Sequence, residues 1–457
     1  MTGETPVSYS VFIIMRIQLS DHFTYKRLLR FVLSPVLMMV FMSIYTVVDG
    51  FFISNFVGKS AFSAVNLIYP FIAILAAIGF MLGTGGTAIV SRLLGEGDKE
   101  TANKYFSLFI IVTAVSGVII CAVGEIMVPY IAKWIGAEDE TYDYCVLYGR
   151  ILLGTIPFFM LQNVFQAFFT TAEKPMLGFL VTGIAGGMNI VLDGILVGAV
   201  RFGVAGAAIA TCASQVVGAV LPTIYFSLKN NSLLRLCKPK FKLRVLLNAC
   251  TNGSSEFINQ ISSSVVAIVF NAQLLELAGE NGVSAYGVLM YVNFIYFAIF
   301  IGYAIGVAPI IGFNYGAGNK AELKNIFRKS MIIMAVAGVM MTGLAIGLAY
   351  PVSKIYVGYD DELFEMTKNA FYICSFMFMF AGFSMFASSM FTAFGNGLIS
   401  ALVSFLRTIV FQISAVMVLP VFLGLTGVWL STLIADILAM ITSMIFVFVK
   451  RKKYGYA

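Results

Sequence analysis

Long apolar runs separated by short polar breaks make up most of the chain. Each run is close to the roughly 20 residues that an α-helix needs to cross a bilayer. Backbone groups in lipid must be hydrogen-bonded within their own segment, so the runs are predicted to be helices. The pattern predicts an all-α integral membrane protein with twelve spans, centred near residues 42, 76, 120, 158, 188, 216, 262, 298, 342, 380, 410 and 437.

The second half of the chain repeats the first at a constant offset of 221 in residue number. Gly58 aligns with Gly279, and the run Gly95-Glu-Gly-Asp-Lys99 aligns with Gly316-Ala-Gly-Asn-Lys320. One offset that holds over most of the chain indicates a duplicated unit. Each copy would contain six spans, an even number, so both copies enter the membrane from the same side. We therefore expect two six-helix lobes related by a pseudo-twofold axis along the membrane normal.

A basic stretch without a long apolar run divides the two copies. The predicted organisation is an N-terminal cytoplasmic segment 1–30, an N-lobe 31–228, a basic linker 229–245, a C-lobe 246–449 and a basic tail 450–457.

Composition and charge support the membrane assignment and set its orientation. The chain is 60% hydrophobic and 11% charged, whereas a soluble domain has about 25% charged residues. Its net charge of +7 is concentrated in alternate loops, in the linker and at the C-terminus. The positive-inside rule then makes both termini and the linker cytoplasmic. We expect a multi-pass membrane protein, and the basic surface reflects topology rather than a nucleic-acid partner.

Residue types that carry metal or nucleotide chemistry are scarce. His22 is the only histidine, and the six cysteines are scattered without a CxxC pair, so we expect no transition-metal site and no cofactor. The Gly-x-Gly turns at 95–97 and 316–318 follow helical runs and lack the P-loop pattern. Transport by this chain would therefore draw on an ion gradient.

Buried polar residues of the first copy point to that ion. Asp49 and Asp193 lie within predicted spans, where ionisable groups are costly, and Asn189 precedes Asp193 by four residues on the same helix face. Oxygen ligands of this kind suit Na⁺, and a buried carboxylate can instead carry a proton. The predicted site is Asp49, Asn189, Asp193 and Thr211, supported by Tyr148 and Asn163.

The repeat acts as an internal control on this site. The second copy keeps the glycines but not the polar cluster, which favours function over helix packing. At the offset of 221, Phe270 replaces Asp49, Val410 replaces Asn189, Ser414 replaces Asp193 and Ser384 replaces Asn163. The alternative is that the two acids form structural ion pairs with Arg150 or Arg407.

The second copy has buried polar residues of its own. Glu256, Gln260 and Arg407 form a possible substrate site or second ion site. Glu256 could neutralise a cationic substrate or pair with Arg407, and both interpretations stay open. Asp436 is more consistent with a structural role.

Several motifs resemble those of the multidrug and toxic-compound extrusion (MATE) transporters, especially the bacterial MepA-like branch. The matching motifs are Val48-Asp-Gly50, Gly83-Thr-Gly-Gly86, Gly95-Glu-Gly-Asp-Lys99, Thr171-Ala-Glu-Lys-Pro175, Asn189-Ile-Val-Leu-Asp193, Gly203–Thr211, Gln260-Ile-Ser-Ser-Ser264 and Gly312–Asn319. The resemblance implies twelve helices in two lobes, alternating access, and export of cationic drugs driven by inward Na⁺ or H⁺. It also implies an N-lobe ion site at the six residues named above. The tenth span has no acid, so a complete C-lobe ion site is not expected.

The buried acids together with the resemblance favour cation-coupled antiport of organic cations by a monomer in the bacterial plasma membrane. A flippase of lipid-linked oligosaccharides shares the lobed plan, but it would favour a cationic cavity. An integral membrane enzyme would need a catalytic cluster that the sequence does not offer.

Overall fold

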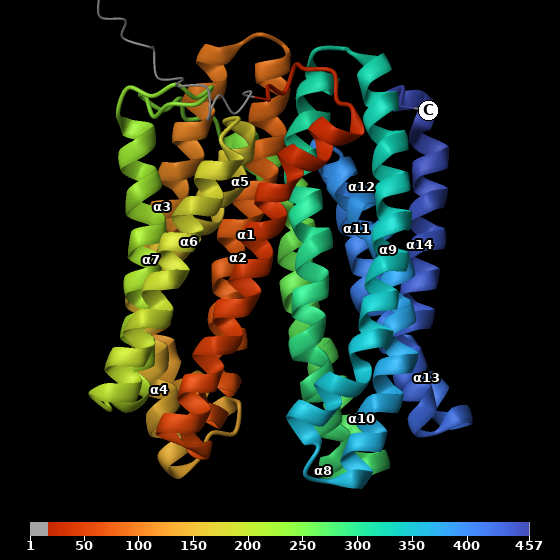
Figure 1. Ribbon diagram of the computed structural model, residues 1–457. Helices are drawn as coiled ribbons and strands as arrows, with labels where there is room; N and C mark the ends of the chain where they lie inside the picture. The colour runs from red at the N-terminus through yellow and green to blue at the C-terminus, as the bar shows by residue number, and fades with distance from the viewer. Residues whose placement is uncertain (1–16, 457) are drawn as a thin grey trace, which may run out of the picture.

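The computed structural model describes residues 17–456, and the regular secondary structure of these residues is helical, without β-strands (Figure 1). The first half contains α1 (Tyr25–Phe52), η1 (Ile53–Val57), α2 (Lys59–Gly95), α3 (Lys99–Trp134), α4 (Asp139–Gly154), α5 (Ile156–Thr171), α6 (Pro175–Asp193), η2 (Gly194–Ala199) and α7 (Gly203–Ser227). The second half contains α8 (Leu243–Gly316), α9 (Lys320–Val357), α10 (Asp361–Cys374), η3 (Ser375–Met377), α11 (Phe378–Ala393), α12 (Gly397–Phe405), η4 (Leu406–Phe411), α13 (Gln412–Leu423) and α14 (Leu425–Tyr454). Residues 1–16 of the predicted N-terminal segment lie outside the described residues.

The helices make twelve membrane crossings, as the sequence predicts, but not all of them are straight. Helix α8 is 74 residues long and is broken at Gly279, where φ is 60° and ψ is −149°. Because an α-helix rises about 1.5 Å per residue, α8 far exceeds the thickness of a bilayer and makes two crossings. Helices α4 and α5 form one crossing that bends by 57°. Proline at position 157, just after the bend, cannot donate the backbone hydrogen bond that a continuous helix would need.

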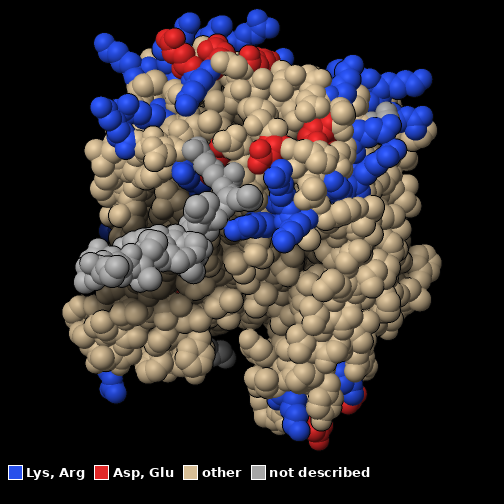
Figure 2. All heavy atoms as spheres, turned by 45° about the horizontal axis from the view of Figure 1, so that its top comes forward, with Lys and Arg blue, Asp and Glu red and all other residues tan. Residues whose placement is uncertain are grey.

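The crossings form two lobes, α1–α7 and α8–α14, which meet at one end and diverge toward the other (Figure 1). Lys and Arg side chains gather at the end where the lobes meet, and a notch separates the lobes at the opposite end (Figure 2). We call these the basic end and the open end. Large apolar side chains such as Ile126, Ile268 and Phe422 are exposed on the helix surfaces, as expected of side chains in contact with lipid.

A pair of glycines at the basic end brings the lobes together. A Cβ atom at Gly95 would collide with the carbonyl oxygen of Phe313, and one at Gly316 would collide with the carbonyl oxygen of Arg92. At the offset of 221, Gly95 corresponds to Gly316 and Arg92 corresponds to Phe313. The two contacts are therefore equivalent under the repeat, and the pseudo-twofold axis passes between them.

Two more glycines form close contacts between the lobes, further from the basic end. A Cβ atom at Gly85 would lie 2.9 Å from the backbone nitrogen of Gly253, and one at Gly306 would lie 3.2 Å from the Cα atom of Val32. These pairs are also related by the offset of 221. The lobes thus pack backbone to backbone through α2 and α8 and through α1 and α8.

The segment 17–24, which we call the strap, crosses the basic end before α1. The backbone N–H of Leu19 donates to Glu173 Oε1 of the N-lobe at 2.8 Å, and Asn314 of the C-lobe donates to the carbonyl of Leu19 at 3.3 Å. The N–H of Phe23 donates to Glu322 Oε1 at 2.9 Å. The strap is therefore hydrogen-bonded to both lobes.

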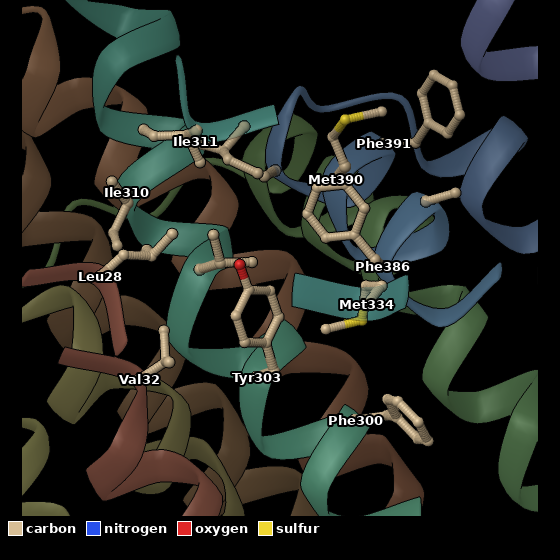
Figure 3. Close-up of a cluster of buried hydrophobic side chains, with 14 of the residues drawn as sticks. Leu28, Val32, Phe300, Tyr303, Ile310, Ile311, Met334, Phe386, Met390 and Phe391 are labelled. Carbon is tan, nitrogen blue, oxygen red and sulfur yellow. The ribbon is translucent and has the colours of Figure 1, made fainter. Parts of the chain in front are cut away.

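Apolar packing also holds the strap against the two lobes. Leu19 and Phe23 are fully buried in a cluster that also contains the first turns of α1 and the interior of the C-lobe. Figure 3 shows Leu28 and Val32 of α1 on the same side of the cluster as Ile310 of α8, with Phe386 and Met390 of α11 across from them. The beginning of α1 thus belongs to the core of the opposite lobe.

Candidate cation-binding site

Packing between α1 and α6 sets the position of the two acids. A Cβ atom at Gly186 would lie 2.7 Å from the rings of both Phe41 and Tyr45, so only glycine lets the two helices approach this closely. Both helices run from the basic end toward the open end (Figure 1). Asp49 follows Tyr45 by four residues, and Asp193 follows Gly186 by seven. Parallel helices in this register carry the two acids to the same depth.

The two carboxyl groups lie close enough for the charge of one to influence the other. Asp193 is fully buried, and both of its carboxylate oxygens, together with Asp49 Oδ1, lack a hydrogen-bond partner among the described residues. The basic residues proposed as structural partners bind elsewhere. Arg150 Nε lies 3.9 Å from Glu125 Oε2, and Arg407 Nε lies 2.9 Å from Asp436 Oδ1. These two ion pairs therefore leave the Asp49–Asp193 pair without either of the proposed cations.

Polar groups of neighbouring helices lie near the acid pair. Asn189 Nδ2 donates to Thr211 Oγ1 of α7 at 3.5 Å, and Asn189 Oδ1 has no hydrogen-bond partner in the described part of the chain. Tyr148 of α4 is buried and interacts with both acids. Asn163 of α5 is buried, and neither its amide nitrogen nor its amide oxygen has a hydrogen-bond partner within residues 17–456. The contacts thus place Asn189, Thr211 and Tyr148 beside the acid pair, while Asn163 is buried elsewhere in the same lobe.

Two tyrosines that the sequence analysis did not select complete the surroundings of Asp49. Tyr45 of α1 and Tyr69 of α2 both interact with its carboxyl group. Tyr45 lies one helical turn before Asp49, so the i−4 spacing could have identified it. Tyr69 could not be found in this way, because its proximity depends on the packing of α2 against α1.

Short π-helical segments follow both acids. Asp193 is the last residue of α6 and η2 begins at the next residue, while η1 begins four residues after Asp49. A π-helical turn leaves the regular i→i−4 hydrogen-bond pattern and is frequent at functional sites. The backbone hydrogen bonding next to each acid therefore departs from that of a continuous α-helix.

The C-lobe residues named from the sequence do not form one cluster. Glu256 is partly exposed, lies three residues beyond the Gly253 crossing, and interacts with Asn259. Arg407 in η4 binds Asp436, and its guanidinium carbon lies 5.5 Å from the ring centroid of Phe297. The Glu256–Arg407 pair left open by the sequence is therefore not formed. Gln260 lies one turn after Glu256 and is partly exposed.

The chemistry of the N-lobe cluster fits a small hard cation or a proton. Two carboxylates at close range in a low-dielectric interior repel each other strongly, and a bound Na⁺ or a shared proton removes that repulsion. Amide and hydroxyl oxygens such as Asn189 Oδ1 and Thr211 Oγ1 are suitable further ligands for Na⁺ beside the carboxylates. Within the described residues, no group of three or more His, Cys, Asp and Glu could hold a metal ion by their usual ligation.

A family model named MatE matches residues 35–195 and 256–418. The starting positions of the two matches, 35 and 256, differ by the offset of the internal repeat. Both lobes therefore carry the same family signature, and together the matches cover more than half of the chain.

Curated relatives and solved structures match over nearly the full length. The chain is 25% identical over 430 residues to the multidrug export protein MepA of Staphylococcus haemolyticus, covering 94% of each chain. It is 28% identical over 421 residues to the protein of that name from Staphylococcus saprophyticus, covering 90% of each. A solved outward-facing multidrug resistance MATE transporter of the MOP superfamily superposes with a TM-score of 0.90 at 23% identity, covering 95% of this chain and 98% of that one.

Proposed function

The chain belongs to the MatE family, and from this premise we propose that it exports organic cations across the bacterial plasma membrane in exchange for Na⁺ or H⁺. It is a multi-pass membrane transporter and not an enzyme. The observation that carries the coupling proposal is the Asp49–Asp193 pair, whose buried oxygens lack partners among the described residues. The relatives named multidrug export proteins support small organic molecules as the substrates.

Charge repulsion provides a coupling mechanism. When the ion leaves, the two carboxylates repel one another and favour separation of α1 from α6. When the ion binds, it draws the two helices together and changes the wall of the space between the lobes. A ligand shifts such an equilibrium by its difference in affinity for the two states. Ion entry from outside would thereby favour the state that releases the drug outward.

The charge distribution supports an orientation for this cycle. We assign the basic end to the cytoplasm by the positive-inside rule, so the conformation described here is open to the outside. Arg407 is neutralised by Asp436, which leaves this buried cation unable to serve a pyrophosphate substrate and disfavours the flippase alternative.

Purified protein in proteoliposomes tests the proposal. Efflux of a fluorescent organic cation such as ethidium would be followed with Na⁺ and pH gradients imposed separately. Asp49→Asn and Asp193→Asn should each abolish the gradient-driven flux, because neither retains two carboxylates to bind the ion. Ser414→Asn, at the position equivalent to Asp193, is the matched control and should transport normally. Normal flux through both aspartate variants would exclude the N-lobe pair as the coupling site.

A further inference from the structure

The polar interior of the N-lobe extends beyond the acid pair toward the basic end. Of the buried side-chain nitrogen and oxygen atoms that lack a hydrogen-bond partner among the described residues, Ser353 Oγ is the only one in the C-lobe. Most of the others lie on α1, α5 and α6: they belong to Asp49, Asn163, Gln166, Thr171, Asn189 and Asp193. Such atoms are costly to bury and need water or an ion as a partner. Their concentration in one lobe calls for a functional reason.

Gln166 stands at a distinct position within this set. It is 5% exposed, and its Nε2 atom lies 3.2 Å from Met42 Sδ and 3.5 Å from Thr182 Oγ1. Its Oε1 atom has no partner within residues 17–456. Met42 precedes Asp49 by seven residues and Thr182 precedes Asp193 by eleven, so this layer lies about 10–16 Å nearer the basic end than the acids. Asn163 lies one turn along α5 between the two layers.

The internal repeat shows that this layer is not required by the fold. At the offset of 221, Ala387 stands in place of Gln166 and Val403 in place of Thr182. Both are buried apolar residues. The same helix packing is thus achieved in the C-lobe with apolar side chains at these two positions.

We propose that Gln166 and Thr182 form a second polar station, on the cytoplasmic side of Asp49–Asp193, through which the coupling cation or the water that carries the proton leaves the N-lobe. The inference rests on the proposed function, because it gives the ion bound at the acids a route inward. Gln166 Oε1 and Thr182 Oγ1 supply oxygen ligands to Na⁺ or hydrogen-bond acceptors to water. The route runs inside the lobe, between α1, α5 and α6, and is separate from the drug path between the lobes.

Kinetics in proteoliposomes test the station. Gln166→Leu and Thr182→Val remove the oxygens at nearly constant volume, and each should lower the rate of gradient-driven efflux by at least about tenfold, because the ion or water loses a ligand or hydrogen-bond acceptor on its route. Drug affinity measured in detergent should stay at the wild-type value. Gln166→Asn and Thr182→Ser keep the polar atoms and should restore most of the rate. Thr342→Val is the control for a general packing effect, because it removes a buried C-lobe hydroxyl that donates a hydrogen bond to the backbone carbonyl of Ser375.

Several outcomes would overturn the station. Wild-type efflux in Gln166→Leu and Thr182→Val would do so, as would polar variants that are as slow as the apolar ones, because packing would then explain the effect. An equal loss in Thr342→Val would have the same meaning. If Asp49→Asn and Asp193→Asn still couple normally, the proposed function itself fails. If they do not couple but the station variants transport normally, only the present inference fails.

Radiolytic hydroxyl-radical labelling tests the route without relying on transport. Hydroxyl radicals formed by radiolysis of water beside Gln166 would oxidise Met42, whose sulfur lies 3.2 Å from Gln166 Nε2, and the oxidation should fall several-fold in Thr182→Val. Met160, fully buried on α5 against Gly79, should stay unlabelled in both proteins. Equal oxidation of Met42 with and without the threonine hydroxyl would contradict a hydrated station at this layer.

Discussion

At the scale of single residues, helical spacing identified the acids but could not show their surroundings. Asn189 and Asp193 are four residues apart, and their absence from the second copy marked them as specific to one lobe. The sequence analysis did not identify Tyr69 and Gln166, because the sequence around each of them resembles that of any membrane-spanning helix. Their importance depends on which helices are neighbours. For the same reason the sequence could not decide which acid Arg407 binds.

The Arg407–Asp436 ion pair gives a prediction at this scale. Its side chains are 14% and 9% exposed, so Asp436→Asn should strand a buried cation and lower stability by about 3 kcal/mol. Thermal unfolding in detergent would measure this as a lower midpoint. Replacing both partners, as Arg407→Met with Asp436→Leu, should recover most of the loss.

The more exposed Arg150–Glu125 pair provides the control. Its side chains are 54% and 36% exposed and the charged atoms are 3.9 Å apart, so Arg150→Met should cost less than about 1 kcal/mol. A double variant no more stable than Asp436→Asn would show that apolar side chains cannot replace the Arg407–Asp436 pair.

At the scale of helices, hydropathy predicted the number of crossings because length and apolar content decide whether a segment spans lipid. It could not predict the bend near Thr155 or the π-helical segments after Asp49 and Asp193, because these are changes in backbone hydrogen bonding within uniformly apolar stretches. The paired glycines at 95 and 316 were visible as a repeat. Their role as the closest contact between lobes required knowing that α2 packs on α8.

The reciprocal glycine contact gives a prediction for these helices. Gly95→Ala and Gly316→Ala each place a Cβ atom against a carbonyl oxygen of the other lobe, which should separate the lobes and destabilise the protein by about 1–3 kcal/mol. Because both substitutions demand the same separation, the double variant should lose less than the sum of the two. Thermal unfolding of the three variants measures this.

Gly343 and Gly347 of α9 are the matched controls, because a Cβ atom at either one would meet no other described atom within 4 Å. Alanine there should be neutral or stabilising by up to about 1 kcal/mol. Strict additivity of the Gly95 and Gly316 variants would show that they act on independent contacts.

At the scale of the whole molecule, the repeat and the charge pattern predicted two parallel lobes. They could not predict which end is closed, because the open and closed states of such a protein share the same helices and differ only in contacts between the lobes. The closed end is held by glycine crossings and by the strap, whose hydrogen bonds to Glu173 and Glu322 link the two lobes. The strap precedes the first span and carries no motif that would have revealed this role.

Loss of Glu322 should loosen the basic end. Glu322 accepts hydrogen bonds from the N–H of Phe23 and from Asn325, and its Oε2 atom lies 2.7 Å from His22 Nδ1. Glu322→Ala should therefore weaken closure by about 1.5–3 kcal/mol and raise the population of molecules open at this end. Spin labels at the exposed positions Glu100 and Lys324 would report it as a longer distance component by double electron–electron resonance.

Glu362→Ala, on an exposed residue of α10 at the opposite end, should leave that distance distribution unchanged. An unchanged distribution in Glu322→Ala would mean that the strap contributes nothing to closure.

The reciprocity of the Gly95 and Gly316 contacts has an evolutionary consequence. In a symmetric homodimer, one surface patch meets its own copy across a twofold axis, and a residue of one subunit touches its neighbour as the neighbour touches it. The contact in this chain has that form. Gly95 contacts residue 313, the equivalent of residue 92, and Arg92 contacts residue 316, the equivalent of residue 95. A six-helix ancestor would have made it by dimerising. Fusion through the linker then made the association intramolecular and independent of protein concentration, and it allowed the two halves to differ at the positions of the acids.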